Sequence, residues 1–134
     1  MKKLLILSAL FCISICSSSA QELMDSHHST IGYISSSGEI MDSHHSTKGY
    51  ISSSGEIMDS HHSTLGYMKD GEIMDSHHST LGYFKSGEAM DSHHSTKGYI
   101  NNGEVMDSHH STIGYFKDVK TGWAAVFYIY FQFR

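Results

Sequence analysis

A seven-residue segment, Met-Asp-Ser-His-His-Ser-Thr, is repeated six times in this chain of 134 residues. The copies begin at Met24, Met41, Met58, Met74, Met90 and Met106. After each copy come a variable residue, a Gly-Tyr pair and an apolar residue, and all but the last copy continue into a polar linker that ends in glycine. The spacing between copies is 17 or 16 residues. Common helical repeats need about 33 residues or more, so this period predicts an all-β repeat protein.

Turn signals divide each repeat into two short apolar stretches, such as residues 39–42 and 48–51. Tyr, Ile and Met recur in these stretches, and neither stretch is long enough for a stable helix. We therefore expect six short β-hairpins, each with Ser-His-His-Ser-Thr at one end and a glycine-ending linker at the other. Hairpins this small are not stable alone. They must share a core, as an open pseudo-symmetric array or as a closed ring that hides its strand edges.

The first twenty residues have the pattern of an export signal. Lys2 and Lys3 precede an apolar run, and Ser18-Ser19-Ala20 supplies small residues for cleavage before Gln21. We expect a signal peptide over 1–20, the six hairpin repeats over 21–116 and a separate tail over 117–134. The predicted location is the periplasm, the cell surface or the extracellular space. Both cysteines lie within 1–20, so disulfides, thiol catalysis and cysteine zinc sites are excluded from the mature chain.

The tail contains no histidine and is rich in aromatic residues. Apolar residues alternate with residues that carry polar atoms from Phe127 to Arg134, and a period of two indicates a strand. We expect a hydrophobic C-terminal β-strand that closes or fills the core. An outer-membrane insertion signal is the alternative, although the repeats lack the ~10-residue alternating segments typical of membrane barrels. The tail is too short to cross a bilayer as a helix, so we expect no transmembrane helix after signal cleavage.

The charge of the mature chain disfavours nucleic acid as a partner. Without the signal segment, seven basic residues remain against fourteen acidic ones, whereas phosphate binding depends on clustered Lys and Arg. The twelve histidines can change this balance in mild acid, because free imidazole titrates near pH ~6.5. The net charge of the surface is therefore expected to depend on pH.

The repeats and the tail together resemble a known family. Asp-Ser, a turn, Ile-Gly-Tyr-Ile and glycine-ending turns, with the finish Val119-Lys120-Thr121-Gly122-Trp123-Ala124-Ala125-Val126-Phe127, are similar to the five-fold beta-flower proteins of Gram-negative bacteria. The resemblance covers about residues 21 to 134. It implies a small, secreted, pseudo-symmetric all-β protein and brings no activity or catalytic residue. The chain departs from the family in having six copies, and in placing His-His where Ser-Gly-type turns are usual; histidine is among the few residues enriched at positive φ.

The histidine pairs are the candidate functional residues, and metal capture is the leading interpretation. Neutral imidazole binds zinc, copper and nickel. One pair gives at most two ligands and a tetrahedral site needs four, so tips must cooperate. Adjacent tips would lie about 9.6 Å apart, within reach of two imidazoles that share an ion. The candidate metal ligands are His27, His28, His44, His45, His61, His62, His77, His78, His93, His94, His109 and His110. Carboxylates that could add an oxygen ligand are Asp25, Asp42, Asp59, Asp75, Asp91 and Asp107.

Three other interpretations remain open. The tips can be inert polar turns on a structural module, with each Asp satisfying backbone groups, or a surface that responds to pH. The Gly-Tyr pairs can offer aromatic rings to a cell-surface glycan, although packing on the sheet is the simpler role for these tyrosines. Hydrolysis by Ser and His would need a convergent triad in a pocket, which a turn does not supply. We therefore expect no enzyme activity and no obligatory cofactor.

Overall fold

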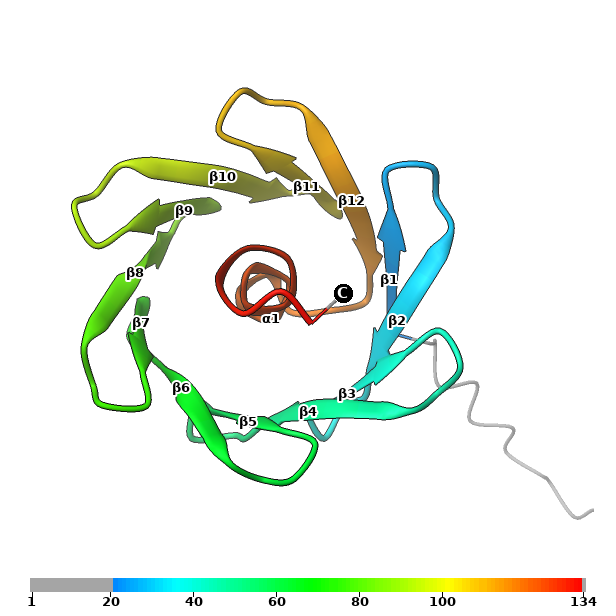
Figure 1. The fold of residues 1–134 in the computed structure, drawn as a ribbon. Coiled ribbons are helices and arrows are strands. Elements are labelled where there is room, and N and C mark those ends of the chain that lie inside the picture. The colour runs from blue at the N-terminus through cyan, green and yellow to red at the C-terminus, as the bar shows by residue number, and fades with distance from the viewer. Residues whose placement is uncertain (1–20, 134) are drawn as a thin grey trace, which may run out of the picture.

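Twelve antiparallel strands form a closed barrel in the computed structural model, which describes residues 21–133. The strands are β1 (Glu22–Asp25), β2 (Thr30–Ile34), β3 (Glu39–Asp42), β4 (Thr47–Ile51), β5 (Glu56–Asp59), β6 (Thr64–Lys69), β7 (Glu72–Asp75), β8 (Thr80–Lys85), β9 (Glu88–Asp91), β10 (Thr96–Asn101), β11 (Glu104–Asp107) and β12 (Thr112–Lys117). Each strand pairs with its neighbours in sequence, and β1 pairs with β12 to close the ring (Figure 1). The prediction of six hairpin repeats is confirmed, and the open array is excluded. The export signal predicted over 1–20 lies outside the described residues.

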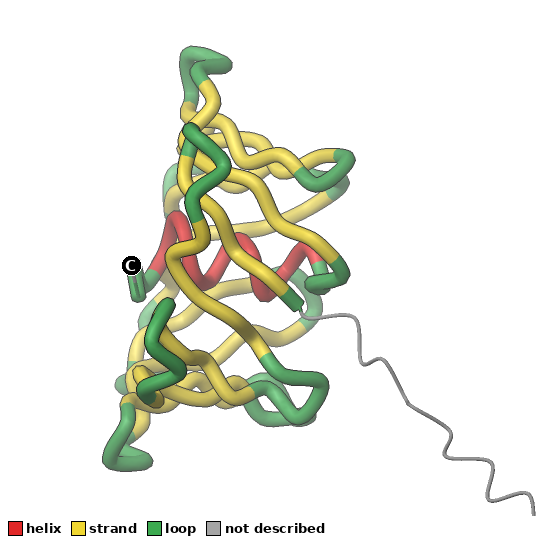
Figure 2. The backbone as a smooth tube through the Cα atoms, turned by 90° about the vertical axis from the view of Figure 1, so that its right-hand side faces the viewer, coloured by secondary structure: helices red, strands yellow, loops and turns green. Residues whose placement is uncertain are grey.

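The barrel has the shape of a flower with six petals (Figure 1). Each petal is a hairpin whose Ser-His-His-Ser tip lies at its outer end, as in the loop between β9 and β10. In the side view the tips flare outward at the end of the barrel where the C-terminus lies (Figure 2). The glycine-ending linkers gather at the opposite, narrower end. The six histidine pairs therefore form a rim around one mouth of the barrel.

A β-bulge bends every hairpin close to its tip. In the β3–β4 hairpin Ile40 pairs with Gly49 and Met41 with Thr47, so Lys48 is the extra residue. Corresponding register shifts occur in the other five hairpins. Bulges increase the local twist and bend the strand that carries them, which fits the outward flare of the petals. The variable residue that follows each Ser-Thr is thus the bulged position.

The linkers change from four residues to two along the chain. Residues 35–38 and 52–55 connect the first hairpins, whereas the loop between β6 and β7 is Asp70-Gly71 alone. Asp70 has φ 51° and Gly71 has φ 80°, and two consecutive residues with positive φ are typical of the type I′ turns that join paired strands. The shortening of the repeat from 17 to 16 residues therefore occurs without disturbing the barrel.

The tail fills the barrel as a helix, so the prediction of a C-terminal strand is wrong. Helix α1 (Thr121–Ala125) continues into the π-helix η1 (Val126–Tyr130), and both lie on the barrel axis (Figure 1). The amide of Phe131 donates to the carbonyl of Val126, five residues earlier, at 3.0 Å. Inside a closed barrel there is no free strand edge, so a buried segment must satisfy its own backbone hydrogen bonds. A helix does this, although the aromatic and β-branched composition favours a strand.

The core lies between this helix and the inward-facing residues of the strands. Leu23, Ile40 and Ile57 of the odd strands are fully buried, as are Ala124 and Val126 of the helix. The glycine of each Gly-Tyr pair also faces the helix. A Cβ added to any of these glycines would lie within 3.5 Å of a side chain from the central helix or the residues that follow it. The pairs are Gly32 with Phe127, Gly49 with Phe133, Gly66 with Phe131, Gly82 with Tyr130, Gly98 with Ile129 and Gly114 with Tyr128.

These glycines are the inner ring of the structure, and they make room both for the helix and for the neighbouring strand. A Cβ on Gly82 would also lie only 2.0 Å from the carbonyl oxygen of Met90. Glycine inside a strand commonly marks such a close approach. Residues 128, 129, 130 and 131 lie against the sixth, fifth, fourth and third hairpins, in that order. Phe133 and Phe127 lie against the second and the first. The central segment, residues 127–133, therefore contacts every repeat with a different side chain.

Two tyrosine hydroxyls of the central segment bond to the barrel backbone. Tyr128 Oη lies 2.7 Å from the carbonyl of Met24 in β1 and 2.9 Å from that of Tyr115 in β12. It thus bridges the seam at which the first and last strands meet. Tyr130 Oη lies 2.6 Å from the carbonyl of Tyr83 and accepts from the amide of Met90 at 3.1 Å. Burial raises the pKa of Tyr130 to about 12.

No helix within residues 21–133 has the length and hydropathy needed to span a membrane.

Candidate functional site

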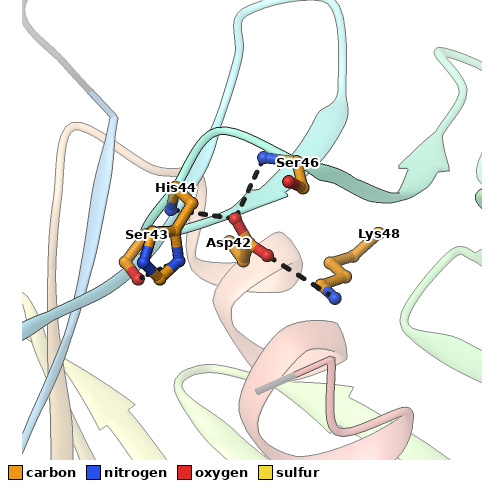
Figure 3. A network of polar contacts seen from close by, with 5 residues as sticks. All are labelled: Asp42, Ser43, His44, Ser46 and Lys48. Atoms are coloured by element: carbon orange, nitrogen blue, oxygen red, sulfur yellow. Dashed lines mark hydrogen bonds and ion pairs between the residues drawn. The ribbon is translucent and has the colours of Figure 1, made fainter.

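The tip of each hairpin is held by its aspartate. In the second repeat Asp42 Oδ1 accepts the amides of His44 and Ser46, both at 2.9 Å (Figure 3). The same two bonds occur at the other five tips. The hydrogen bond from the backbone amide of the serine is the main reason why the pKa of each tip aspartate lies below its ordinary value. One carboxylate oxygen is therefore used by the turn, as the inert-turn interpretation expects.

The second histidine of each pair adopts a left-handed backbone conformation. Its φ lies between 63° and 64° at all six tips, at His28, His45, His62, His78, His94 and His110. Few residues other than glycine take this conformation, and histidine is one of those enriched there. The amide of this histidine donates to the carbonyl of the tip aspartate, for example from His45 to Asp42 at 3.0 Å. Positive φ was considered for the histidine pair as a whole, and within residues 21–133 it is found at the second member of each pair.

The same histidine stacks on a tyrosine of the preceding repeat. His45 lies on Tyr33 with 4.5 Å between ring centroids and 17° between ring planes. The stack on Tyr115 is made by His28, at 3.9 Å, so the contact also crosses the seam of the barrel. The other four stacks pair His62 with Tyr50, His78 with Tyr67, His94 with Tyr83 and His110 with Tyr99. We name these six the stacked histidines. They link each hairpin to the one before it.

The first histidine of each pair is exposed and has few contacts. In Figure 3 the ring of His44 lies beside Ser43, with 3.4 Å between Nδ1 and the serine Oγ. The other five first histidines have the same contact at 3.3 to 3.4 Å. We name these six the rim histidines: His27, His44, His61, His77, His93 and His109. Their imidazoles are available to solvent.

One tip carries an ion pair that distinguishes it from its neighbours. Lys48 Nζ lies 3.5 Å from Asp42 Oδ2, the carboxylate oxygen that the turn does not use (Figure 3). At the fifth tip the charge of Lys97 also helps to lower the pKa of Asp91. The remaining four tips have Ile31, Leu65, Leu81 or Ile113 at this position. The variable residue therefore sets the charge beside an otherwise constant tip.

The twelve predicted metal ligands lie on one rim, but they do not converge. Among residues 21–133 no three side chains of His, Asp, Glu or Cys are grouped so that they could hold a metal ion. The hairpins flare apart at their tips (Figure 2), and the stacked histidines are turned toward the tyrosines. At each tip the aspartate binds the backbone amide of the rim histidine and not its ring. The structure does not bring together the four-ligand cluster that adjacent tips were expected to form.

A methionine also takes part in each contact between neighbouring hairpins, and the sequence analysis assigned it no role. Met90 is paired across the strands with Tyr83, on which His94 stacks. These three side chains line a groove of about 420 Å³ together with Asp70 and Lys85. Tyr99, Met106 and His110 line the next groove, of about 360 Å³. The tyrosines thus lie on the outer face of the sheet and not in the core. The constant methionine before each Asp-Ser was the available signal.

The glutamates that open the odd strands each accept a hydrogen bond within their own hairpin. Glu39 Oε1 accepts the hydroxyl of Thr47 at 2.6 Å in the same hairpin. The other five hairpins have the same bond, from Thr30 to Glu22, Thr64 to Glu56, Thr80 to Glu72, Thr96 to Glu88 and Thr112 to Glu104. These carboxylates therefore hold the hairpins together and are separate from the rim.

The comparisons with known proteins agree with the architecture. A family model described as 5-fold beta-flower protein matches residues 20–132. The description specifies five-fold symmetry, whereas this barrel closes with six hairpins and none of them is peripheral. The searches of curated proteins and of solved structures find no match.

Proposed function

We propose that the protein, which belongs to the 5-fold beta-flower family, is an exported, non-enzymatic module that binds divalent metal ions at the rim of the barrel. The observation that carries this proposal is the exposure of all six rim histidines, whose only side-chain hydrogen bond within residues 21–133 is a long contact to serine. Imidazole is the commonest side-chain ligand for such metals.

Each tip offers an open coordination site. The rim histidine supplies one nitrogen, and the aspartate has a second oxygen, Oδ2, that the turn does not use. Zinc, copper or nickel held by the imidazole would complete its shell with water, with another molecule or, after rotation of the side chains, with Oδ2. A single site of this kind binds metal weakly. Six of them on one rim allow the module to bind several ions and to attach with avidity to a surface that carries metal.

The two lysine tips provide a test within the same chain. Lys48 lies against Asp42 Oδ2, so it competes with a metal ion for that oxygen and adds a positive charge. The third tip has Leu65 at the corresponding position, and no ion pair to Asp59 is found within residues 21–133. The proposal therefore expects metal to be held more tightly at His61 than at His44.

Calorimetric titration of Zn²⁺ and Ni²⁺ tests the proposal, with the full chain carrying Cys12→Ser and Cys16→Ser so that no thiol competes. We expect several saturable sites near pH 7.5 that are lost near pH 5.5, because protonated imidazole cannot bind metal. Changing all six rim histidines to serine should abolish binding, and His61→Ser should remove more than His44→Ser. Heats equal to those of buffer dilution would refute the proposal.

A glycan-binding module is the second candidate, and the grooves between hairpins favour it. Tyr83 lines the first groove beside Lys85 and Asp70, a combination of an aromatic edge with charged groups that can hydrogen-bond a sugar. Tyrosine fluorescence would be followed during titration with cell-surface oligosaccharides in the presence of a chelator. A saturable change that the chelator does not affect supports this function over metal binding at the rim.

A further inference from the structure

The contact between neighbouring hairpins contains a second kind of metal ligand, separate from the rim histidines. Each odd strand has an outward-facing, half-buried methionine that pairs with a tyrosine of the preceding hairpin. The six methionines are Met24, Met41, Met58, Met74, Met90 and Met106. The tyrosine opposite each methionine is also the one that carries the stacked histidine. One thioether and one imidazole therefore flank every tyrosine.

The grooves show that the two groups face one space. Met90 and His94 both line the groove beside Tyr83, and Met106 and His110 both line the groove beside Tyr99. Residues opposite each other in antiparallel strands have Cβ atoms about 5 Å apart. Stacking at 4.4 Å holds the ring of His94 over the same tyrosine. The thioether and the imidazole are thus positioned by one aromatic ring.

The ring nitrogens of the stacked histidines are free to act as ligands. Within residues 21–133 neither nitrogen of these six rings has a hydrogen-bond partner, since their bonds are made by the backbone amide. Glycine or asparagine would also supply the positive φ, so the turn by itself does not require an imidazole. The stacked imidazole instead has a fixed orientation and unused donor and acceptor atoms.

We propose that each pair of methionine and stacked histidine is a site for monovalent copper. Thioether ligands select Cu(I) over divalent ions, whereas the harder imidazole and carboxylate of the rim suit zinc, nickel or Cu(II). Cu(I) accepts few ligands, so one sulfur and one nitrogen suffice without the clustered acidic groups that the barrel lacks among its described residues. The site does not depend on the divalent-metal function proposed for the rim. The barrel then carries two rings of sites with different metal preference.

Silver titration tests this site without copper redox chemistry, because Ag(I) is a soft monovalent ion of the same preference. The full chain with Cys12→Ser and Cys16→Ser is titrated with Ag⁺, and tyrosine fluorescence is recorded because the ion would lie beside the phenol rings. We expect saturation near six ions per chain. Repeating the titration with Cu(I) against a coloured Cu(I) chelator should give the same number.

Single substitutions then separate a ligand from a packing residue. Met90→Leu conserves volume and should lower the stoichiometry by one. His94→Asn keeps a residue that tolerates positive φ and should also remove one ion. Met68→Leu is the matched control, because Met68 packs beside Gly122 away from the stacked histidines, and it should change nothing. Circular dichroism and the unfolding midpoint verify that each variant is folded.

The outcome distinguishes this site from the rim. Replacing all six rim histidines by serine should leave Ag⁺ stoichiometry unchanged while it abolishes Zn²⁺ binding. Equal Ag⁺ stoichiometry for Met90→Leu, Met68→Leu and the parent chain would overturn the proposal and leave the methionines as packing partners of the tyrosines. Absence of saturable Ag⁺ binding would overturn it as well.

Discussion

The inner ring of glycines and the outer ring of stacked histidines each use one residue per repeat, yet they meet opposite kinds of partner. The six glycines contact six different positions of the central segment. The six histidines each contact the same residue type, a tyrosine, with nearly the same geometry. Repeats that are equivalent on the outside are therefore distinct on the inside. Changes inside should be large and specific to one repeat, and changes outside should be small and similar in every repeat.

Truncation of the central helix should have the largest effect. Phe127 is 1% exposed and faces Gly32, so Phe127→Ala leaves a cavity in the middle of the barrel. We expect a loss of about 4 kcal/mol in the free energy of unfolding, measured by urea denaturation. Leu81→Ala at an exposed position of the rim is the control, with a loss below about 0.5 kcal/mol. Comparable losses would contradict the distinction between inside and outside.

A methyl group added to the inner ring should be nearly as harmful. The Cβ of Gly82→Ala would lie 2.0 Å from the carbonyl oxygen of Met90 and 3.0 Å from Tyr130 Cε1. Because the closest atom belongs to the backbone, strands must move apart, and we expect a loss of about 2 to 3 kcal/mol. Adding Tyr130→Ala to this variant should not restore stability. Recovery in the double variant would indicate that the helix, and not the neighbouring strand, requires the glycine.

Removal of the Tyr130 hydroxyl should have an intermediate effect that depends on pH. Tyr130→Phe leaves the amide of Met90 without its bond and should cost about 1 kcal/mol. Burial raises the pKa of Tyr130 from 10.0 to about 12, so folding favours the neutral phenol. This contribution is complete below pH 10 and is lost as the pH rises through about 12. Alkaline unfolding curves should therefore show a smaller loss for Tyr130→Phe than for the parent; curves of the same slope would disprove the assignment.

Substitution of a stacked histidine should produce a smaller effect that its backbone explains. His45 has φ 63°, a conformation that costs a residue with Cβ about 1 kcal/mol relative to glycine. His45→Ala and His45→Gly both lose the stack on Tyr33, so the glycine variant should be the more stable by about that amount. Thermal unfolding of the two variants measures the difference. The same two substitutions at His62 should give the same difference in stability, because the stacked histidines have nearly the same geometry in every repeat.

Acid should weaken the tips gradually. The pKa of Asp42 in the folded chain lies below its ordinary value of 3.8, mainly because the Ser46 amide donates a hydrogen bond to the carboxylate. The turn's contribution is therefore present above pH 3.8 and is lost as the pH falls through the lower folded value. Asp42→Asn keeps an oxygen for the same amides but cannot titrate. The unfolding midpoint of the asparagine variant should fall less between pH 5 and about 2.5 than that of the parent. An equal fall would exclude the hydrogen bond from Ser46 to Asp42 as the cause.

The sequence predicts the outer half of this molecule better than the inner half. Hairpins, turns and the positive φ of one histidine are local properties, encoded by glycine-ending linkers and a short polar tip. The alternation from Phe127 to Phe133 has the period of a strand, but the tail is surrounded by a closed sheet and forms a helix. The glycines at positions such as 82 place a small residue inside every even-numbered strand. The reason for these glycines can be seen only when the position of the tail inside the barrel is known.

Placement of the candidate ligands divides in the same way. The location of all twelve histidines at the tips follows from the repeat, whereas the stacking of one member of each pair on Tyr33 or its counterparts depends on the neighbouring hairpin. The flat spacing of ~9.6 Å between tips assumed an untwisted array. The bulge at positions such as Lys48 bends the hairpins outward, and the cluster of four ligands does not form.

Because Tyr128 bonds to both β1 and β12, the contact that secures the closure of the barrel depends on the central segment. A nascent chain interrupted before this residue can form every hairpin, but its first and last strands would remain two unprotected edges, open to pairing with other chains. The segment that follows all twelve strands supplies both the filling of the lumen and the hydroxyl at the seam. Closure of the ring thus depends on a segment that follows every strand, and a chain truncated before it would expose strand edges that favour aggregation.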